Sequence, residues 1–230
     1  AVFAAVTSAV AQSGFEVIAV YGRFMGEFYL GIALLWLLLF LAATAVIGLR
    51  AVALFRAVRE PALLAFATAS SEAAYPKTLA QLEQFGCSNR VASFVLPLGY
   101  SFNLDGSMMY CTFATLFIAQ AYGIELSAAQ QVTMLLILMV TSKGMAGVPR
   151  ASLVVIAATL AQFDIPEAGL LLLLGVDHFL DMARSATNVI GNSVATAVVS
   201  KWEGLLRGEG ELNPALEHAM DPAVPHGHGA

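Results

Sequence analysis

Five polar side chains lie on one face of a segment that is otherwise apolar and long enough to span a bilayer. They occur between residues 170 and 200, as Asp177, Asp181, Arg184, Asn188 and Asn192. At about 100° per residue, they occupy an arc of roughly 80° on an α-helix. Each charge at a membrane centre costs about 2.5–3.5 kcal/mol on insertion scales, so three charges here need protein partners or a polar ligand. We interpret this stripe as the lining of a binding site.

The chemistry of the stripe suits an acidic solute. Arg184 offers a planar, permanently charged fork that matches a carboxylate. It can bind a substrate carboxylate or pair structurally with Asp181 or Asp177, and both can hold in different states. Because the stripe has two aspartates and one arginine, one carboxylate remains, and it can bind a substrate ammonium group, a cation or a proton. We assign the ammonium to Asp181 and expect Asp177 to orient Arg184, while Asn188 and Asn192 serve a carboxylate and a cation, or join helices.

Composition indicates an integral membrane protein. Of 230 residues, 59% are hydrophobic and 12% charged, against roughly 25% charged in soluble domains. The net charge of −5 comes without a basic cluster for nucleic acid. Cys87 and Cys111 lie in different segments and predict free thiols. We find no nucleophile–base pair or metal-ligand spacing, so we expect neither an enzyme nor a cofactor, and no metal beyond a possible Na⁺.

The order of segments predicts an all-α multi-pass protein with two re-entrant helical hairpins and an inverted repeat. Arginines between the first span and the first hairpin place that linker in the cytoplasm. Apolar arms broken in the middle, in corresponding positions of two halves, indicate a transporter site at the membrane midplane. The predicted segments are a span at 25–48, a hairpin at 61–86, a broken span at 91–122, a hairpin at 131–163 and the polar span at 170–200.

We divide the chain into three parts. Residues 1–24 are expected to end a scaffold-type span, residues 25–202 to form a transport-domain core, and residues 203–230 to form a disordered cytoplasmic tail. The second hairpin is expected to enter from outside the cell. The C-terminus is therefore predicted to lie in the cytoplasm of a bacterial inner (plasma) membrane protein.

Interrupted helices expose backbone groups that can bind ligands. Asp105 lies in the break Asn103-Leu104-Asp105-Gly106, where carbonyl oxygens and a carboxylate suit an alkali ion, although Asp105 could instead cap the helix. Ser70, Ser71 and the tip at 144–149, including Gly147, could cradle a ligand, or could be small simply to allow tight packing. Lys143, Arg150 and Glu72 are gate or cavity residues with no assigned role.

Four motifs in order carry a family resemblance: TASSEAAYP, SFNLDGS, TSKGMAGVP and LDMARSATNVIGN. With them the chain resembles the dicarboxylate/amino acid:cation symporters, the glutamate transporter family, of the bacterial proton/sodium-glutamate type. Members have about twice this length, so the resemblance implies a C-terminal half that begins in the fifth span. It also implies a homotrimer in lipid, elevator-type alternating access, and a second hairpin that is the extracellular gate.

The resemblance implies roles for individual residues. Arg184 is similar to the arginine that holds the substrate's side-chain carboxylate, Asp181 to the acid that binds its amino group, and Asn188 to the asparagine at its α-carboxylate. The other expected substrate contacts are Ser70, Ser71, Ser107, Gly147 and Val148. The expected cation-binding residues are Gly99, Ser101, Asn103, Asp105, Ser142 and Asn192.

Departures from the family pattern affect the coupling ion. Asn192 stands where sodium-coupled members often have Asp, which weakens a cation site and leaves coupling to H⁺ or Na⁺ open. Leu104 replaces a Met, Met145 replaces a Thr near the gate, and Cys111 occupies the position of the proton-carrying glutamate of animal members. Asp181 favours an amino acid over a C4-dicarboxylate. We therefore expect glutamate/aspartate symport; the alternatives are symport of succinate, fumarate or malate, an anion channel, and a membrane structural subunit.

Overall fold

The first described helix, α2 (Glu16–Ile47), covers most of the predicted first span and begins earlier than residue 25. The computed structural model describes residues 16–143, 145 and 149–208. An ion pair between Arg23 and Glu27, one turn apart, supports the added helical turns. Among the described residues, α2 is the one helix that is both long and apolar enough to cross a membrane. The predicted boundary at residue 24 therefore falls inside a continuous helix.

The first hairpin consists of two short helices, α4 (Arg59–Thr68) and α5 (Tyr75–Phe85), joined by a tight turn. The linker before it forms the helix α3 (Arg50–Ala57). Ala69 adopts a left-handed backbone with φ of 50°, which ends α4 and allows the amide of Ser70 to bond to the carbonyl of Ala65 at 3.1 Å. Insertion of this hairpin into a membrane stays a prediction.

The predicted broken span is two helices, α6 (Asn89–Phe102) and α7 (Asp105–Ala121). The helix ends at Asn103 and resumes at Asp105, where the sequence analysis placed the break. The second hairpin consists of α8 (Ala128–Thr141) and α9 (Ala151–Gln162), and a capping box of Ser127 and Gln130 starts α8.

The predicted polar span is not one helix. It begins as the short α10 (Leu170–Leu173), which the 3₁₀ turn η1 (Glu167–Gly169) precedes, and α11 (Asp177–Trp202) follows after a turn. Gly175 lies in that turn and lowers helix propensity there. The break makes Asp177 the first residue of α11, so the whole polar stripe falls on a single helix.

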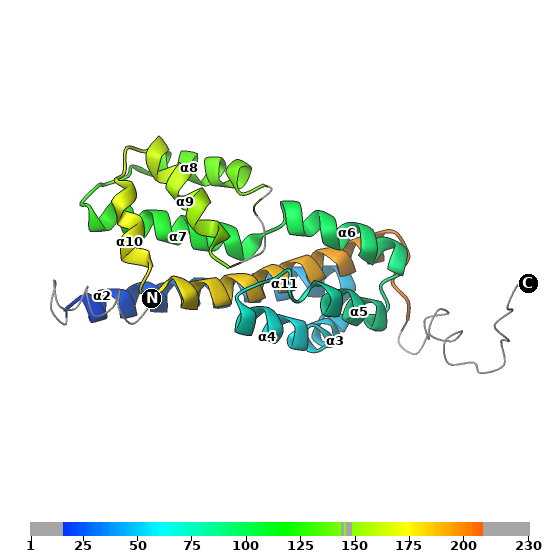
Figure 1. The fold of residues 1–230 in the computed structure, drawn as a ribbon. Helices are drawn as coiled ribbons and strands as arrows, with labels where there is room; N and C mark the ends of the chain where they lie inside the picture. The colour runs from blue at the N-terminus through cyan, green and yellow to red at the C-terminus, as the bar shows by residue number, and fades with distance from the viewer. Residues whose placement is uncertain (1–15, 144, 146–148, 209–230) are drawn as a thin grey trace, which may run out of the picture.

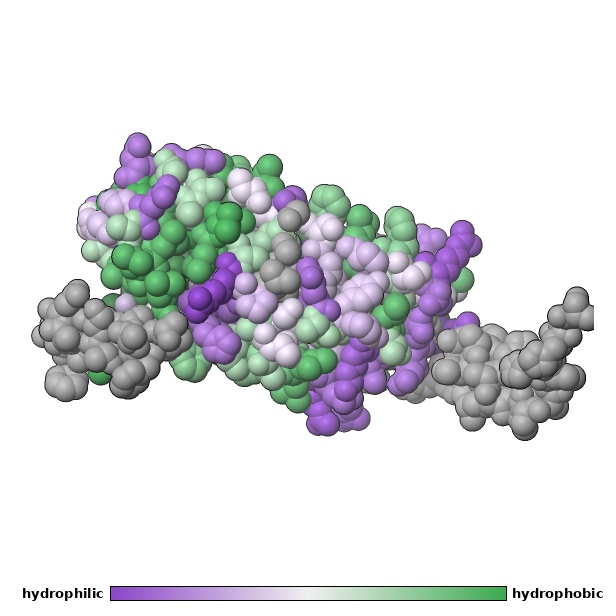
Figure 2. Space-filling model, in the orientation of Figure 1, coloured by the Kyte–Doolittle hydropathy of each residue, from purple (hydrophilic) through white to green (hydrophobic). Residues whose placement is uncertain are grey.

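Helix α11 runs through the middle of the molecule (Figure 1) and packs against α2, α4, α6 and α7. Helices α7 to α9 lie on one side of it and α3 to α5 on the other. On the face in Figure 2, apolar side chains gather over the α8–α9 end and hydrophilic ones over the α3–α5 end. Beyond α11, the amide of Arg207 bonds to the carbonyl of Gly86 at 3.0 Å, so the first part of the predicted disordered tail is ordered. Residues 209–230 lie outside the described part.

Candidate functional site

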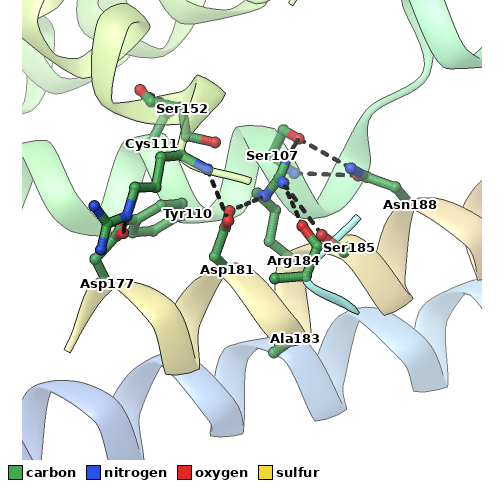
Figure 3. Close-up of polar contacts among 12 residues, drawn as sticks. Ser107, Tyr110, Cys111, Ser152, Asp177, Asp181, Ala183, Arg184, Ser185 and Asn188 are labelled. Atoms are coloured by element: carbon green, nitrogen blue, oxygen red, sulfur yellow. Dashed lines mark hydrogen bonds and ion pairs between the residues drawn. The ribbon is translucent and has the colours of Figure 1, made fainter. Parts of the chain in front are cut away.

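Arg184 is fully buried at the centre of the site (Figure 3). Its Nε forms an ion pair with Oδ1 of Asp181 at 2.5 Å. The guanidinium also donates to the hydroxyl oxygens of Ser107, at 3.2 Å, and Ser185, at 3.1 Å, and to the carbonyl oxygen of Ala69 at 3.5 Å. These partners come from α11, α7 and the first hairpin turn, so one side chain connects three parts of the fold.

Asn188 and Ser107 are bonded to each other twice. The Nδ2 of Asn188 donates to Oγ of Ser107 at 3.0 Å, and its Oδ1 accepts from the amide of Ser107 at 3.2 Å. The two helices approach closely here, because a Cβ on Gly106 would lie 2.2 Å from the carbonyl oxygen of Arg184. A glycine before Ser107 therefore lets α7 begin directly against α11.

Arg150 contacts both aspartates, one through its backbone amide and the other through its side chain. The backbone amide of Arg150 donates to Oδ2 of Asp181 at 2.9 Å. The side-chain Nε of Arg150 lies 3.4 Å from Oδ2 of Asp177. The hydroxyl of Tyr110 donates to Oδ1 of Asp177 at 2.5 Å. Two carboxylates are thus balanced by two guanidiniums, with Asp177 bound to Arg150 and Tyr110 instead of in the predicted contact with Arg184.

The sequence analysis left Arg150 without a role and did not name Tyr110. A signal for Tyr110 was present, because it lies one helical turn after Ser107 on the same face of α7. Arg150 gave no such signal. Its contacts depend on a left-handed backbone, with φ of 65°, just before α9.

The sequence analysis gave Arg184 two possible partners, a substrate carboxylate or an aspartate of the same helix. The structure has the ion pair between Arg184 and Asp181, with both side chains buried, so the two groups satisfy each other here. Ser107 and Asn188, two further predicted substrate contacts, adjoin the same pair. A ligand that enters must therefore replace contacts that the protein makes with itself.

Four predicted cation-binding residues converge where the α6–α7 break crosses α11. The Nδ2 of Asn103 donates to Oδ1 of Asn192 at 3.2 Å. A Cβ on Gly99 would lie 2.3 Å from the same Oδ1, and a Cβ on Gly191 would lie 2.1 Å from Oδ2 of Asp105. These close approaches put amide and carboxylate oxygens next to an interrupted backbone, a donor set that suits a hard cation.

The remaining predicted site residues lie in the turn of the first hairpin, in α6 and after α8, or outside the described residues. Ser71 is buried, and its carbonyl accepts from the hydroxyl of Tyr100 at 2.9 Å, while Oγ of Ser70 accepts from the amide of Ala73. Ser101 is exposed. The Oγ of Ser142 contacts Sδ of Met108 at 3.1 Å. Gly147 and Val148 lie outside the described residues.

Comparison with known sequences identifies the family of the chain. The profile of the sodium:dicarboxylate symporter family matches residues 1–202. The chain belongs to the sodium:dicarboxylate symporter family. Membership in this symporter family indicates a location in a membrane, which agrees with the apolar composition. Cys87 and Cys111, for which free thiols were predicted, are free and buried.

Three similar relatives are named either as glutamate symport proteins or as C4-dicarboxylate transport proteins. The chain is 52% identical over 157 residues to the "proton/sodium-glutamate symport protein" of Bacillus caldotenax, covering 68% of the chain and 37% of that relative. It is 42% identical over 214 residues to the protein of that name from Bacillus subtilis (strain 168), covering 93% and 48%. It is 44% identical over 230 residues to the "C4-dicarboxylate transport protein" of Laribacter hongkongensis, covering 97% and 52%. The chain thus spans about half or less of these relatives.

Proposed function

We propose that the protein is a secondary symporter that takes up glutamate or aspartate together with H⁺ or Na⁺. The observation that carries this proposal is the buried pair of Arg184 and Asp181. A guanidinium binds a carboxylate and a neighbouring carboxylate binds an ammonium group, so the pair is complementary to an acidic amino acid. The glutamate symport proteins of the two Bacillus species support this choice.

Binding would proceed as an exchange of partners. The side-chain carboxylate of the substrate takes the place of Asp181 at the guanidinium of Arg184, and Asp181 receives the substrate's ammonium group. The hydroxyl of Ser107 and the amide of Asn188 then serve the α-carboxylate. Since removal of one partner from a buried ion pair costs about 3–5 kcal/mol, an exchange of this kind avoids an uncompensated charge at every stage.

The second hairpin would act as the gate over this site. Arg150 connects the hairpin to Asp181 through its backbone amide and to Asp177 through its side chain. Opening the hairpin releases both carboxylates from Arg150 and frees Asp181 for the substrate. Elevator-type movement within a homotrimer is part of the same proposal and follows the family resemblance.

The coupling cation would bind beside the helix break. Asp105, Asn103, Gly99 and Asn192 surround this position, close to the substrate residues of α11. An amide at Asn192 in place of a carboxylate leaves the site with less negative charge. Uptake should therefore be measured with Na⁺ and pH varied separately, because the ion gradient that drives accumulation identifies the coupling ion.

The decisive experiment replaces Asp181 with Asn in the whole protein reconstituted in liposomes. Loss of the ammonium contact should lower uptake of labelled glutamate about 10- to 100-fold, while uptake of succinate, which has no ammonium group, should persist. Asp164→Asn, on an exposed residue after α9, is the matched control and should transport normally. Unchanged glutamate uptake by Asp181→Asn would refute the role of Asp181.

A C4-dicarboxylate symporter is the second candidate function. It is favoured by the Laribacter hongkongensis relative, whose C4-dicarboxylate name belongs to a match over 97% of the chain. The same liposomes decide between the two. Accumulation of succinate but not glutamate by the unmodified protein would establish the second function and reject the first.

A further inference from the structure

An apolar groove lies between α2, α4 and α11, apart from the substrate site. It has a volume of about 310 Å³, and Trp36, Ala62, Phe66 and Ile190 are among the residues that line it. Ala186 and Ile190 form its floor on α11. At about 100° per residue they lie on roughly the opposite face of that helix from the polar stripe. The groove is therefore a separate feature of the molecule.

In the orientation predicted from the sequence, with Ile47 and Arg59 at the cytoplasmic surface of the membrane, the groove extends from that surface toward the bilayer centre. Arg59 begins α4 and Phe66 lies seven residues further, about 10 Å along the helix axis. Trp36 lies eleven residues before the end of α2 at Ile47, about 16 Å along that helix. In a hydrocarbon core of about 30 Å, this distance reaches the middle of the bilayer. A narrow apolar space of this depth has the shape of a lipid acyl chain.

A single charged residue, Arg59, lines the groove, at its shallow end. Its side chain is exposed and forms no hydrogen bond or ion pair with the residues that the structure describes. The neighbouring Glu60 is paired with Lys77 and not with Arg59. A guanidinium fork matches a phosphate group, and basic side chains at the cytoplasmic ends of membrane helices attract anionic lipids.

The surface around the groove is continuous with the surface of α2 that faces outward. Leu63 on the rim is 60% exposed, and Leu30 on α2 is 72% exposed. The other large exposed apolar side chains of α2 are Ile18, Val20, Leu34, Leu37, Leu38 and Leu41. Such a surface is compatible with lipid tails on every side of the groove.

We propose that this groove binds one acyl chain of an anionic phospholipid, with the lipid phosphate on Arg59. The apolar walls select a hydrocarbon chain, and the unpaired guanidinium at the membrane surface selects a negatively charged headgroup. A bound chain lies between α2 and α4 and braces the first hairpin against α11. The site is independent of the substrate, so it can be tested apart from transport.

Trp36 provides a direct test because its ring lines the groove. Its Nε1 is fixed by a hydrogen bond of 2.8 Å to Oγ1 of Thr187. The whole protein, with its other tryptophans replaced by Phe, is placed in nanodiscs containing phosphatidylglycerol or phosphatidylcholine with brominated acyl chains. Bromine quenches Trp36 fluorescence on contact. Half-maximal quenching should need about fivefold less brominated phosphatidylglycerol than phosphatidylcholine.

Three variants complete the test. Arg59→Gln should remove the preference for phosphatidylglycerol, while Arg90→Gln, on an exposed arginine outside the groove, should keep it. Ala62→Leu fills the groove and should weaken quenching by both lipids. An unchanged emission maximum of Trp36 in lipid without bromine shows that each variant is folded.

Other results would overturn the proposal. Equal quenching by the two lipids, or a preference that survives Arg59→Gln, would remove the phosphate site. An absence of quenching by either lipid would show that protein covers the groove, either from the rest of the polypeptide or from a second copy, and would also reject a lipid occupant.

Discussion

The two hairpins contact the central helix by different means. The first, α4–α5, packs directly on α11 with small side chains, and Ala65, Ala69 and Ala74 are all fully buried there. The helices of the second, α8 and α9, pack on α7 and on each other. This hairpin reaches the site residues of α11 through the polar contacts of Arg150.

In the proposed mechanism, this difference makes the first hairpin a fixed wall of the site and the second hairpin a detachable cover. Close apolar packing cannot be released without leaving a void, which destabilises the protein. Polar contacts can be exchanged for contacts with a ligand or water. Both hairpins contact the pair of Arg184 and Asp181. Arg184 donates to the carbonyl of Ala69 in the first hairpin, and Asp181 accepts from the amide of Arg150 in the second.

Replacement of Arg184 with Cys should have the largest effect, because it breaks the connection between both hairpins and removes the proposed carboxylate-binding group. Glutamate uptake into liposomes should fall below detection. Asp181 would then be a buried charge without its partner, at a cost of about 3–5 kcal/mol. Arg184→Lys, which keeps the charge but loses the fork, should fold more stably and still transport poorly. Accumulation of glutamate by Arg184→Cys would refute the site.

Ala65→Leu tests the close packing of the first hairpin on α11. Ala65 is fully buried on α4, so added methyl groups should lower the free energy of unfolding by about 1–3 kcal/mol. Ala158→Leu on α9 is the matched control, because Ala158 is exposed, and its effect should stay within about 0.5 kcal/mol. Thermal unfolding in detergent measures both. Equal destabilisation by the two variants would contradict the contrast between the hairpins.

Arg150→Gln tests the cover and should have the smallest effect. Its side chain is half exposed and its Nε lies 3.4 Å from Asp177, so its loss should cost about 1 kcal/mol or less. The second hairpin should then open about fivefold more often. Maleimide labelling of a Ser152→Cys variant lacking Cys87 and Cys111 measures this opening, since Ser152 is fully buried at the start of α9.

Lys77→Gln is the control for that measurement. It breaks an exposed ion pair with Glu60 on the first hairpin and should leave the labelling rate at position 152 unchanged. A labelling rate that does not respond to Arg150→Gln either would show that the ion pair with Asp177 does not hold the cover.

Much of the fold could be predicted from local patterns. The α6–α7 break falls at Asn103 and Leu104 because the motif there contains a glycine and polar residues that interrupt an apolar helix. The turn before α11 was not predicted, because the run of leucines that precedes Gly175 has the same hydropathy as a continuous helix. The hydropathy of a segment depends on its side chains and does not reveal one turn of irregular backbone.

The amino-acid sequence by itself determined the polar stripe of α11, because helical periodicity puts Asp177, Asp181 and Arg184 on one face whatever surrounds them. The tertiary structure alone decided which partners these groups have. Arg150 and Tyr110 reach Asp177 from elements that are distant in the sequence, and a left-handed backbone at Arg150 directs its amide to Asp181. Such contacts depend on the relative placement of helices, which periodicity within one helix does not encode.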